Sequence, residues 1–127
     1  MFGGDFTRIK IKGYLKNITE KEINTFENNA IKSKSKISYI IDNNKYTLNY
    51  SNNSKVILKR DNNEYICNMI FQINKNNMIN YYSKDNDIYL DVEMKTININ
   101  ITDKCIKIKY LIIDSDTEYE YYVEMSD

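Results

Sequence analysis

The sequence predicts an all-β fold in which a single antiparallel meander closes into a barrel of about eight to ten strands. Apolar and polar residues alternate with a period of two along most of the chain, as half-buried strands require. Pairs of asparagine interrupt the alternation at a spacing typical of tight turns. Basic residues on the first predicted strand and acidic residues on the last would attract each other if those strands were neighbours.

Length and composition limit the organisation and chemistry of the protein. With 127 residues, we expect one domain over residues 1–127. The chain has no His and two Cys, which excludes His-dependent nucleophilic triads and all-thiolate zinc sites. We therefore predict a protein that is not an enzyme and that holds no cofactor and no metal ion.

Asparagine is expected to form the turns. Tight hairpins need residues that tolerate positive φ, usually Gly or Asn, and the chain has no Gly after Gly13. Asn pairs occur at residues 28–29, 43–44, 52–53, 62–63 and 76–77. Further polar turns are predicted at residues 85–87, 102–104 and 114–116.

Between these turns the alternation predicts nine or ten strands. In the first, Ile9, Ile11 and Leu15 alternate with basic residues. The later ones cover residues 23–34, 37–41, 46–50, 56–58, 65–71, 78–82, 88–101, 106–110 and 119–123. Residues 19–22 resemble a helix start, but we expect a polar loop there because an Asn pair follows soon after.

The predicted strand over residues 88–101 changes phase along its length. Its first apolar residues, up to Met94, share one face, whereas Ile97, Ile99 and Ile101 take the other. A β-bulge or a barrel corner near residues 95–97 would explain the change.

The formal charge of zero conceals two oppositely charged halves. Residues 1–60 hold twelve basic and five acidic residues, and residues 61–127 hold six basic and thirteen acidic ones. The outward phase carries Arg8, Lys10 and Lys12 on the first strand and Glu118, Glu120 and Glu124 on the last. Barrel closure would place these opposite charges side by side.

Arg60 is a candidate site residue because it continues the alternation of Val56 and Leu58, which places its side chain on the apolar phase. A guanidinium group there needs acceptors, since an unpaired buried charge is costly. Two interpretations are open. Arg60 closes one end of the barrel by pairing with a carboxylate or strand-end carbonyls, or it anchors an anionic ligand in an apolar cavity.

Tyrosines supply the other candidate residues. Many of the twelve tyrosines fall on inward phases, and their hydroxyls need partners. Their rings either fill the interior, which is the favoured interpretation, or line a space for one small ligand. The candidates for contact with such a ligand are Tyr39, Tyr46, Tyr81 and Tyr121.

The remaining reactive residues carry weaker signals. Cys67 shares the phase of Met69 and Phe71 and is predicted to be a core thiol, whereas Cys105 should be more exposed, and both should be free. The acidic clusters at residues 85–87 and 114–118 lack the Gly and Glu of calcium loops, so we expect solvated turns.

The sequence also bears on cellular location. The N-terminal segment has no basic stretch followed by an apolar run, and no apolar run approaches the length of about 18 residues needed to span a membrane. We therefore expect a cytoplasmic protein that does not associate with membranes.

Several segments together resemble a known family. The segment 8–14 (RIKIKGY) is similar to the first strand of the YwiB-like domain of unknown function, a family of Gram-positive bacterial proteins. Residues 36–39 (KISY) and 56–62 (VILKRDN) are similar to later strands, and 81–86 (YYSKDN) resembles a Tyr-x-Thr-x-x-Gly motif with Ser and Asn in place of Thr and Gly. The resemblance implies a calycin- or lipocalin-like barrel and no established activity, and it highlights Arg60 and Tyr81.

Two functions remain open from the sequence. The first is binding of a small amphipathic or anionic ligand between Arg60 and the interior tyrosines. The alternative is an interaction protein whose basic face, including Lys32, Lys34 and Lys36, contacts RNA or an acidic protein partner. A ligand barrel should keep a cavity that reaches Arg60, whereas a surface binder should have a filled interior.

Overall fold

The computed structural model describes residues 6–52 and 54–127, and these residues form ten strands. The strands are β1 (Phe6–Asn17), β2 (Glu22–Ser33), β3 (Lys36–Ile41), β4 (Asn44–Asn52), β5 (Lys55–Asp61), β6 (Tyr65–Phe71), β7 (Asn76–Ser83), β8 (Ile88–Ile101), β9 (Cys105–Ile112) and β10 (Thr117–Ser126). Residues 18–21 form a turn and not a helix, in agreement with the predicted polar loop.

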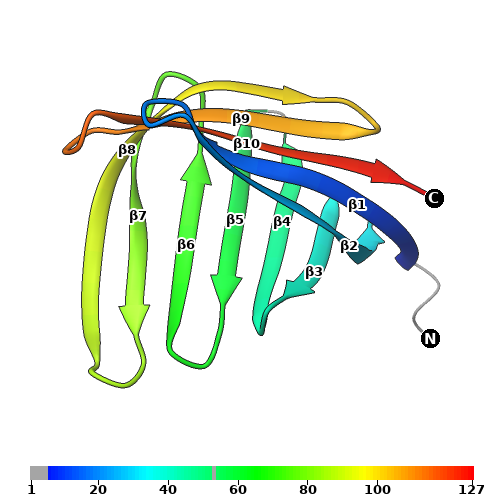
Figure 1. Ribbon diagram of the computed structural model, residues 1–127, viewed down its shortest axis with the longest axis horizontal. Coiled ribbons are helices and arrows are strands. Elements are labelled where there is room, and N and C mark those ends of the chain that lie inside the picture. The colour runs from blue at the N-terminus through cyan, green and yellow to red at the C-terminus, as the bar shows by residue number, and fades with distance from the viewer. Residues whose placement is uncertain (1–5, 53) are drawn as a thin grey trace.

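The strands form one closed antiparallel barrel. Each strand pairs with the next in sequence, and β1 pairs with β10 to complete the circle. In Figure 1, β3–β7 run across the direction of β9, β10 and β1, while β8 bends from one set to the other. The predicted meander, its closure and its strand number are confirmed.

The bend of β8 contains the predicted β-bulge. The β8–β9 register shifts between Thr96 and Asn98, so Ile97 is the extra residue. Met94 and Thr96 are buried on one phase, and Ile99 is buried on the other. The bulge therefore keeps apolar residues inside the barrel on both sides of the bend.

The β1–β10 seam brings the expected charges together in register but not in ion pairs. Lys12 lies opposite Glu124, and Lys16 lies opposite Glu120. These acids accept hydrogen bonds from tyrosine hydroxyls instead. Tyr14 donates to Glu120 Oε2 over 2.5 Å, and Tyr122 donates to Glu124 Oε2 over 2.9 Å.

The two other basic residues expected at the seam do not face acids of β10. Lys10 lies opposite Ser126, and Arg8 lies beyond the paired part of β10, opposite Ile31 of β2. Closure is thus correct, whereas the prediction that opposite charges face each other across the seam holds for Lys12 and Glu124 but not for Lys10 or Arg8. The hydroxyls of Tyr14 and Tyr122 bind the acids, and the lysine side chains extend into solvent.

Gly13 permits a close approach within this seam. A Cβ atom at this position would clash with the backbone carbonyl oxygen of Tyr122 and would lie 2.8 Å from Cζ of Phe26. The absence of a side chain therefore lets the Phe26 ring turn inward over β1.

The prediction that Asn pairs form the turns is only partly correct. The turns at Asn43-Asn44 and Asn62-Asn63 are present, and Asn62 Oδ1 accepts hydrogen bonds from the backbone of Glu64 and Tyr65, each over 2.8 Å. The turns at residues 85–87, 102–104 and 114–116 are also present, and the pair at 52–53 lies partly outside the described residues.

Two other Asn pairs lie within strands. Asn28-Asn29 belongs to β2, opposite β1, and Asn76-Asn77 belongs to β7, opposite β8. Left-handed backbone is supplied mainly by other residues, and the described non-Gly residues with positive φ are Lys21, Lys34, Asp42, Asn43, Asn74, Asp87 and Asp116. Asp shares with Asn a short polar side chain that tolerates this conformation.

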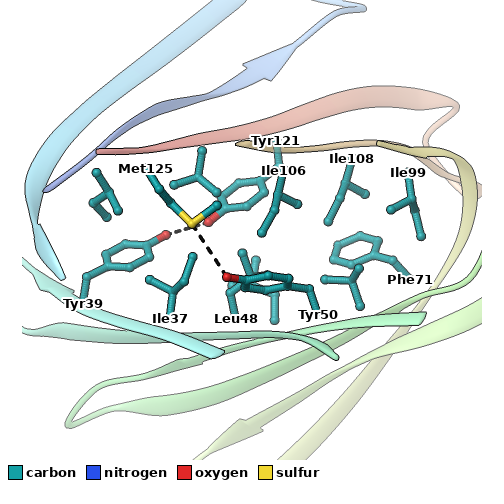
Figure 2. Close-up of a cluster of buried hydrophobic side chains, with 14 of the residues drawn as sticks. Ile37, Tyr39, Leu48, Tyr50, Phe71, Ile99, Ile106, Ile108, Tyr121 and Met125 are labelled. Atoms are coloured by element: carbon teal, nitrogen blue, oxygen red, sulfur yellow. Dashed lines mark hydrogen bonds between the residues drawn. The ribbon is translucent and has the colours of Figure 1, made fainter. Parts of the chain in front are cut away.

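The core fills one end and the middle of the barrel. Ile37, Leu48, Phe71, Ile106 and Ile108 are fully buried, and Figure 2 shows them packed between opposite walls. The Tyr50 hydroxyl also turns inward and donates to Met125 Sδ over 3.7 Å. The other end of the barrel is not filled.

Candidate functional site

A cavity of about 570 Å³ opens at the end of the barrel that carries the odd-to-even turns. Many of its lining residues lie close to these turns, such as Ile41 and Tyr46 around the β3–β4 turn and Ile112 and Tyr119 around the β9–β10 turn, and others such as Phe71 lie deeper in the barrel. Near this end β2 separates from β3, because the two strands pair only through residues 31–33 of β2. The interpretation that tyrosine rings fill the interior is therefore wrong for this half.

All five sequence-predicted site residues line this one cavity. Register explains how they meet: Tyr39 lies opposite Tyr46, which lies opposite Arg60, and Tyr81 faces Cys67, which is the other neighbour of Arg60. Tyr121 reaches the cavity from β10 on the opposite wall. Most of the other lining residues are apolar, with Leu, Ile, Met, Val and Phe side chains, and the rest are Asn24, Thr25, Cys67, Tyr110 and Tyr119.

Arg60 has no counter-ion among the described residues. Its Nε atom is buried and has no hydrogen-bond partner, and the ion pairs of the described chain are Lys84–Asp61 and Lys109–Glu118. The guanidinium carbon lies 4.9 Å from the centroid of the Tyr65 ring. The interpretation that Arg60 closes the barrel by pairing with a carboxylate is therefore wrong.

The charge of Arg60 is retained despite its position. Burial acts to lower the pKa of Arg60, but the neighbouring Tyr65 and Tyr46 side chains outweigh burial and raise it. The cavity thus contains a permanent cation whose Nε–H donor is unused.

Aromatic rings form the wall beside Arg60. Tyr39 stacks on Tyr46 with ring centroids 4.9 Å apart and on Phe26 with centroids 5.7 Å apart, at 13° in both cases. Phe26 also stacks on Tyr121 at 6.3 Å. These nearly parallel faces suit contact with an apolar or planar molecule.

A buried hydroxyl pair adds a second polar point. The hydroxyls of Tyr39 and Tyr121 lie 2.8 Å apart and share a hydrogen bond, as Figure 2 shows. Burial is the main cause that raises the pKa of both groups, so both stay protonated. Because the pair has two hydrogens and one shared bond, one hydrogen remains for a further acceptor.

Cys67 contributes a thiol to the same wall. It is 4% exposed, and both cysteines are free, with Cys105 partly exposed as predicted. Burial raises the pKa of the Cys67 thiol, although Tyr81 and Arg60 act in the opposite direction. Burial likewise raises the pKa of Tyr81 to about 12, so Cys67 and Tyr81 are neutral at pH 7.

Four aromatic residues of the cavity, Phe26, Phe71, Tyr110 and Tyr119, are not among the predicted site residues. Phe26 shares its strand phase with Asn24 and Asn28, and these polar neighbours hide an inward face. Tyr110 and Tyr119 lie opposite each other on β9 and β10, with rings 5.4 Å apart. Both tyrosines alternate with Lys or Glu in the sequence, and this pattern could have indicated that they face the interior.

The lysines of the alternative hypothesis lie at the opposite end of the barrel. Lys32 and Lys34 line a second hollow of about 850 Å³, together with Lys104 and with the carboxylates of Asp103, Glu124 and Asp127. Carboxylates therefore balance the lysines, and this hollow presents no continuous basic surface.

Two kinds of feature are absent from the part of the chain that the structure describes. No group of three or more Cys, Asp or Glu residues is placed there to hold a metal ion. That part of the chain also contains no helix that is long and apolar enough to cross a membrane.

Comparison with known proteins bears on the fold. No protein-family model and no curated protein sequence matches the chain. The crystal structure of the ywiB protein from Bacillus subtilis matches with a TM-score of 0.73 and 16% sequence identity, over 96% of this chain and 92% of that chain. The chain therefore has a YwiB-like fold, as the sequence resemblance predicts.

Proposed function

We propose that the protein binds a small amphipathic anion in the cavity. The observation that carries the proposal is the buried, unpartnered Nε of Arg60, which lines a hollow of about 570 Å³. Cavities of this size hold small molecules and are typically apolar with a few well-placed polar groups. The anionic group would pair with Arg60, and the apolar body would contact the rings of Phe26, Tyr39 and Tyr46.

The hydroxyl pair of Tyr39 and Tyr121 supports a more specific ligand. Its remaining hydrogen can donate to an acceptor on the apolar body, such as a carbonyl or ether oxygen. Both residues are at most 5% exposed, so this contact would form away from water. The ligand would thus carry an anionic group and a second, uncharged acceptor.

The alternative of a nucleic-acid or acidic-protein partner has less support. A surface binder should have a filled interior, and the barrel contains a hollow that reaches Arg60. The lysines of the other end share their hollow with three carboxylate side chains. The ligand-binding function therefore accounts for more of the structure.

Fluorescence titration with anilinonaphthalene sulfonate, an amphipathic aromatic anion, tests the proposal. Arg60→Gln should weaken binding by about ten- to a hundredfold, because a hydrogen bond to a charged group contributes about 1.5–3 kcal/mol. Arg8→Gln is the matched control, since Arg8 is exposed on the outer face of β1. Equal binding by both variants, with both folded by circular dichroism, would overturn the proposed function.

A further inference from the structure

We infer that the cavity selects ligands with a single negative charge and rejects dianions of the same shape. This inference rests on the proposed function and names the ligand class of the same site. Two separate features carry it: the number of charges inside the cavity and the charge of the turns around its mouth.

The interior offers one charge for a ligand to neutralise. Nineteen residues line the cavity, and among the described residues Arg60 is the only Lys, Arg, Asp or Glu in that lining. The remaining lining is apolar or neutral and polar, including the thiol of Cys67 and the phenols of the tyrosines. One anionic group can pair with Arg60, whereas a second one inside would have no cation and would be costly to bury.

The mouth does not favour a second anionic group either, because acidic residues outnumber lysines in its turns. The five turns at this end cover residues 18–21, 42–43, 62–64, 84–87 and 113–116, and together they hold seven acidic residues and two lysines. The acidic residues, called here the acidic rim, are Glu20, Asp42, Glu64, Asp85, Asp87, Asp114 and Asp116. Lys84 is already engaged, because its Nζ lies 2.9 Å from Asp61 Oδ1 and donates to the Asn62 carbonyl over 2.7 Å.

The turns at the opposite end of the barrel are not acidic. Their described residues, 34–35, 54, 72–75 and 102–104, contain three lysines and one aspartate, and Glu124 and Asp127 lie near them. The turns at the two ends therefore differ in charge, and the acidic turns lie around the cavity. An anion must cross a repulsive field to reach Arg60, and a dianion meets twice that repulsion.

The first experiment compares two planar ligands that differ in charge number. Naphthalene monosulfonate and naphthalene disulfonate are both fully ionised at pH 7, and each is used to displace anilinonaphthalene sulfonate from the wild-type protein. We expect the monosulfonate to bind at least tenfold more tightly. Equal or tighter binding of the disulfonate would overturn the inference while leaving the proposed function in place.

The second experiment measures association rates with a neutralised rim. Asp114→Asn/Asp116→Asn keeps side chains that tolerate the positive φ of residue 116 and removes two charges. At about 0.01 M ionic strength, two charges roughly 10 Å from an entering anion should slow it about threefold, and a dianion about tenfold. Neutralising Asp114 and Asp116 should therefore speed association about threefold for the monosulfonate and about tenfold for the disulfonate.

Controls separate the rim from net charge. Asp103→Asn/Glu124→Gln removes two charges at the opposite end and should leave the rates unchanged. Raising the ionic strength to about 0.15 M should also speed association with the wild type, because the exposed rim is screened more than Arg60. Slower association with added salt, or equal effects of the two double variants, would overturn the inference. If neither sulfonate displaces the probe, the proposed function fails and the inference fails with it.

Discussion

Arg60→Met should have opposite effects on ligand binding and on stability. In the ligand-free barrel, Arg60 has a buried Nε without a partner and no carboxylate pairs with it. A residue retained for folding would be expected to have its donors satisfied. Methionine has a similar length and fills the same space without a charge or a donor.

The magnitude follows from two opposing contributions. Removing an unsatisfied buried donor relieves about 1–3 kcal/mol. The loss of the contact between the guanidinium and the Tyr65 ring, at 4.9 Å, costs about 0.5–1 kcal/mol. The net gain is therefore about 1 kcal/mol, which in a chain of 127 residues raises Tm by about 4 °C.

Thermal and urea denaturation of the ligand-free protein measure this effect. Arg8→Met is the matched control, because Arg8 is exposed and its replacement should change the free energy of unfolding by less than about 0.5 kcal/mol. Arg60→Met should also lose affinity for anilinonaphthalene sulfonate. Destabilisation by more than about 1 kcal/mol would refute the reasoning, since it would show that Arg60 contributes to folding.

Three further outcomes concern the barrel itself. Gly13→Ala should lower the free energy of unfolding by about 1–3 kcal/mol in urea titrations, because its Cβ clashes with the Tyr122 carbonyl oxygen, and an unchanged midpoint would contradict the close packing of this seam. Phe71→Ala should cost about 3–5 kcal/mol, since Phe71 is fully buried, and a loss below about 1 kcal/mol would contradict its place in the core. The raised pKa values of Tyr39 and Tyr121 stabilise the fold below pH about 10, the ordinary tyrosine pKa, and this stabilisation is lost as pH rises further. Tyrosinate absorbance should therefore increase cooperatively with unfolding above pH about 10, and non-cooperative ionisation of all twelve tyrosines would disagree.

The sequence was sufficient to predict most of the fold, for physical reasons. Period-two alternation reports which side chains face inward, so it located the strands and the β-bulge at Ile97. The turns were harder to locate, because Asn tolerates both a left-handed turn and an extended strand. Asn28-Asn29 and Asn76-Asn77 lie in strands, while Asp and Lys supply several left-handed positions.

The candidate site could be predicted in part. Strand phase indicated that Arg60 and four tyrosines face inward, and the structure brings all five to one cavity. Phase does not report how closely opposite walls approach, so a filled and an open interior both remained possible from the sequence. The acidic clusters at residues 85–87 and 114–118 were predicted as solvated turns, and only the meander topology shows that five turns surround one mouth.

The most direct test of ligand binding uses the two cysteines. Cys67 lines the cavity, whereas Cys105 lines the hollow at the opposite end and serves as an internal control. Alkylation with iodoacetamide at about pH 9, where part of the thiol groups is ionised, is followed residue by residue by mass spectrometry. Saturating naphthalene monosulfonate should slow a measurable reaction at Cys67 and leave the reaction at Cys105 unchanged. Arg60→Gln should remove this protection. An unchanged alkylation rate at Cys67 in the presence of the bound probe would contradict a ligand site inside the barrel.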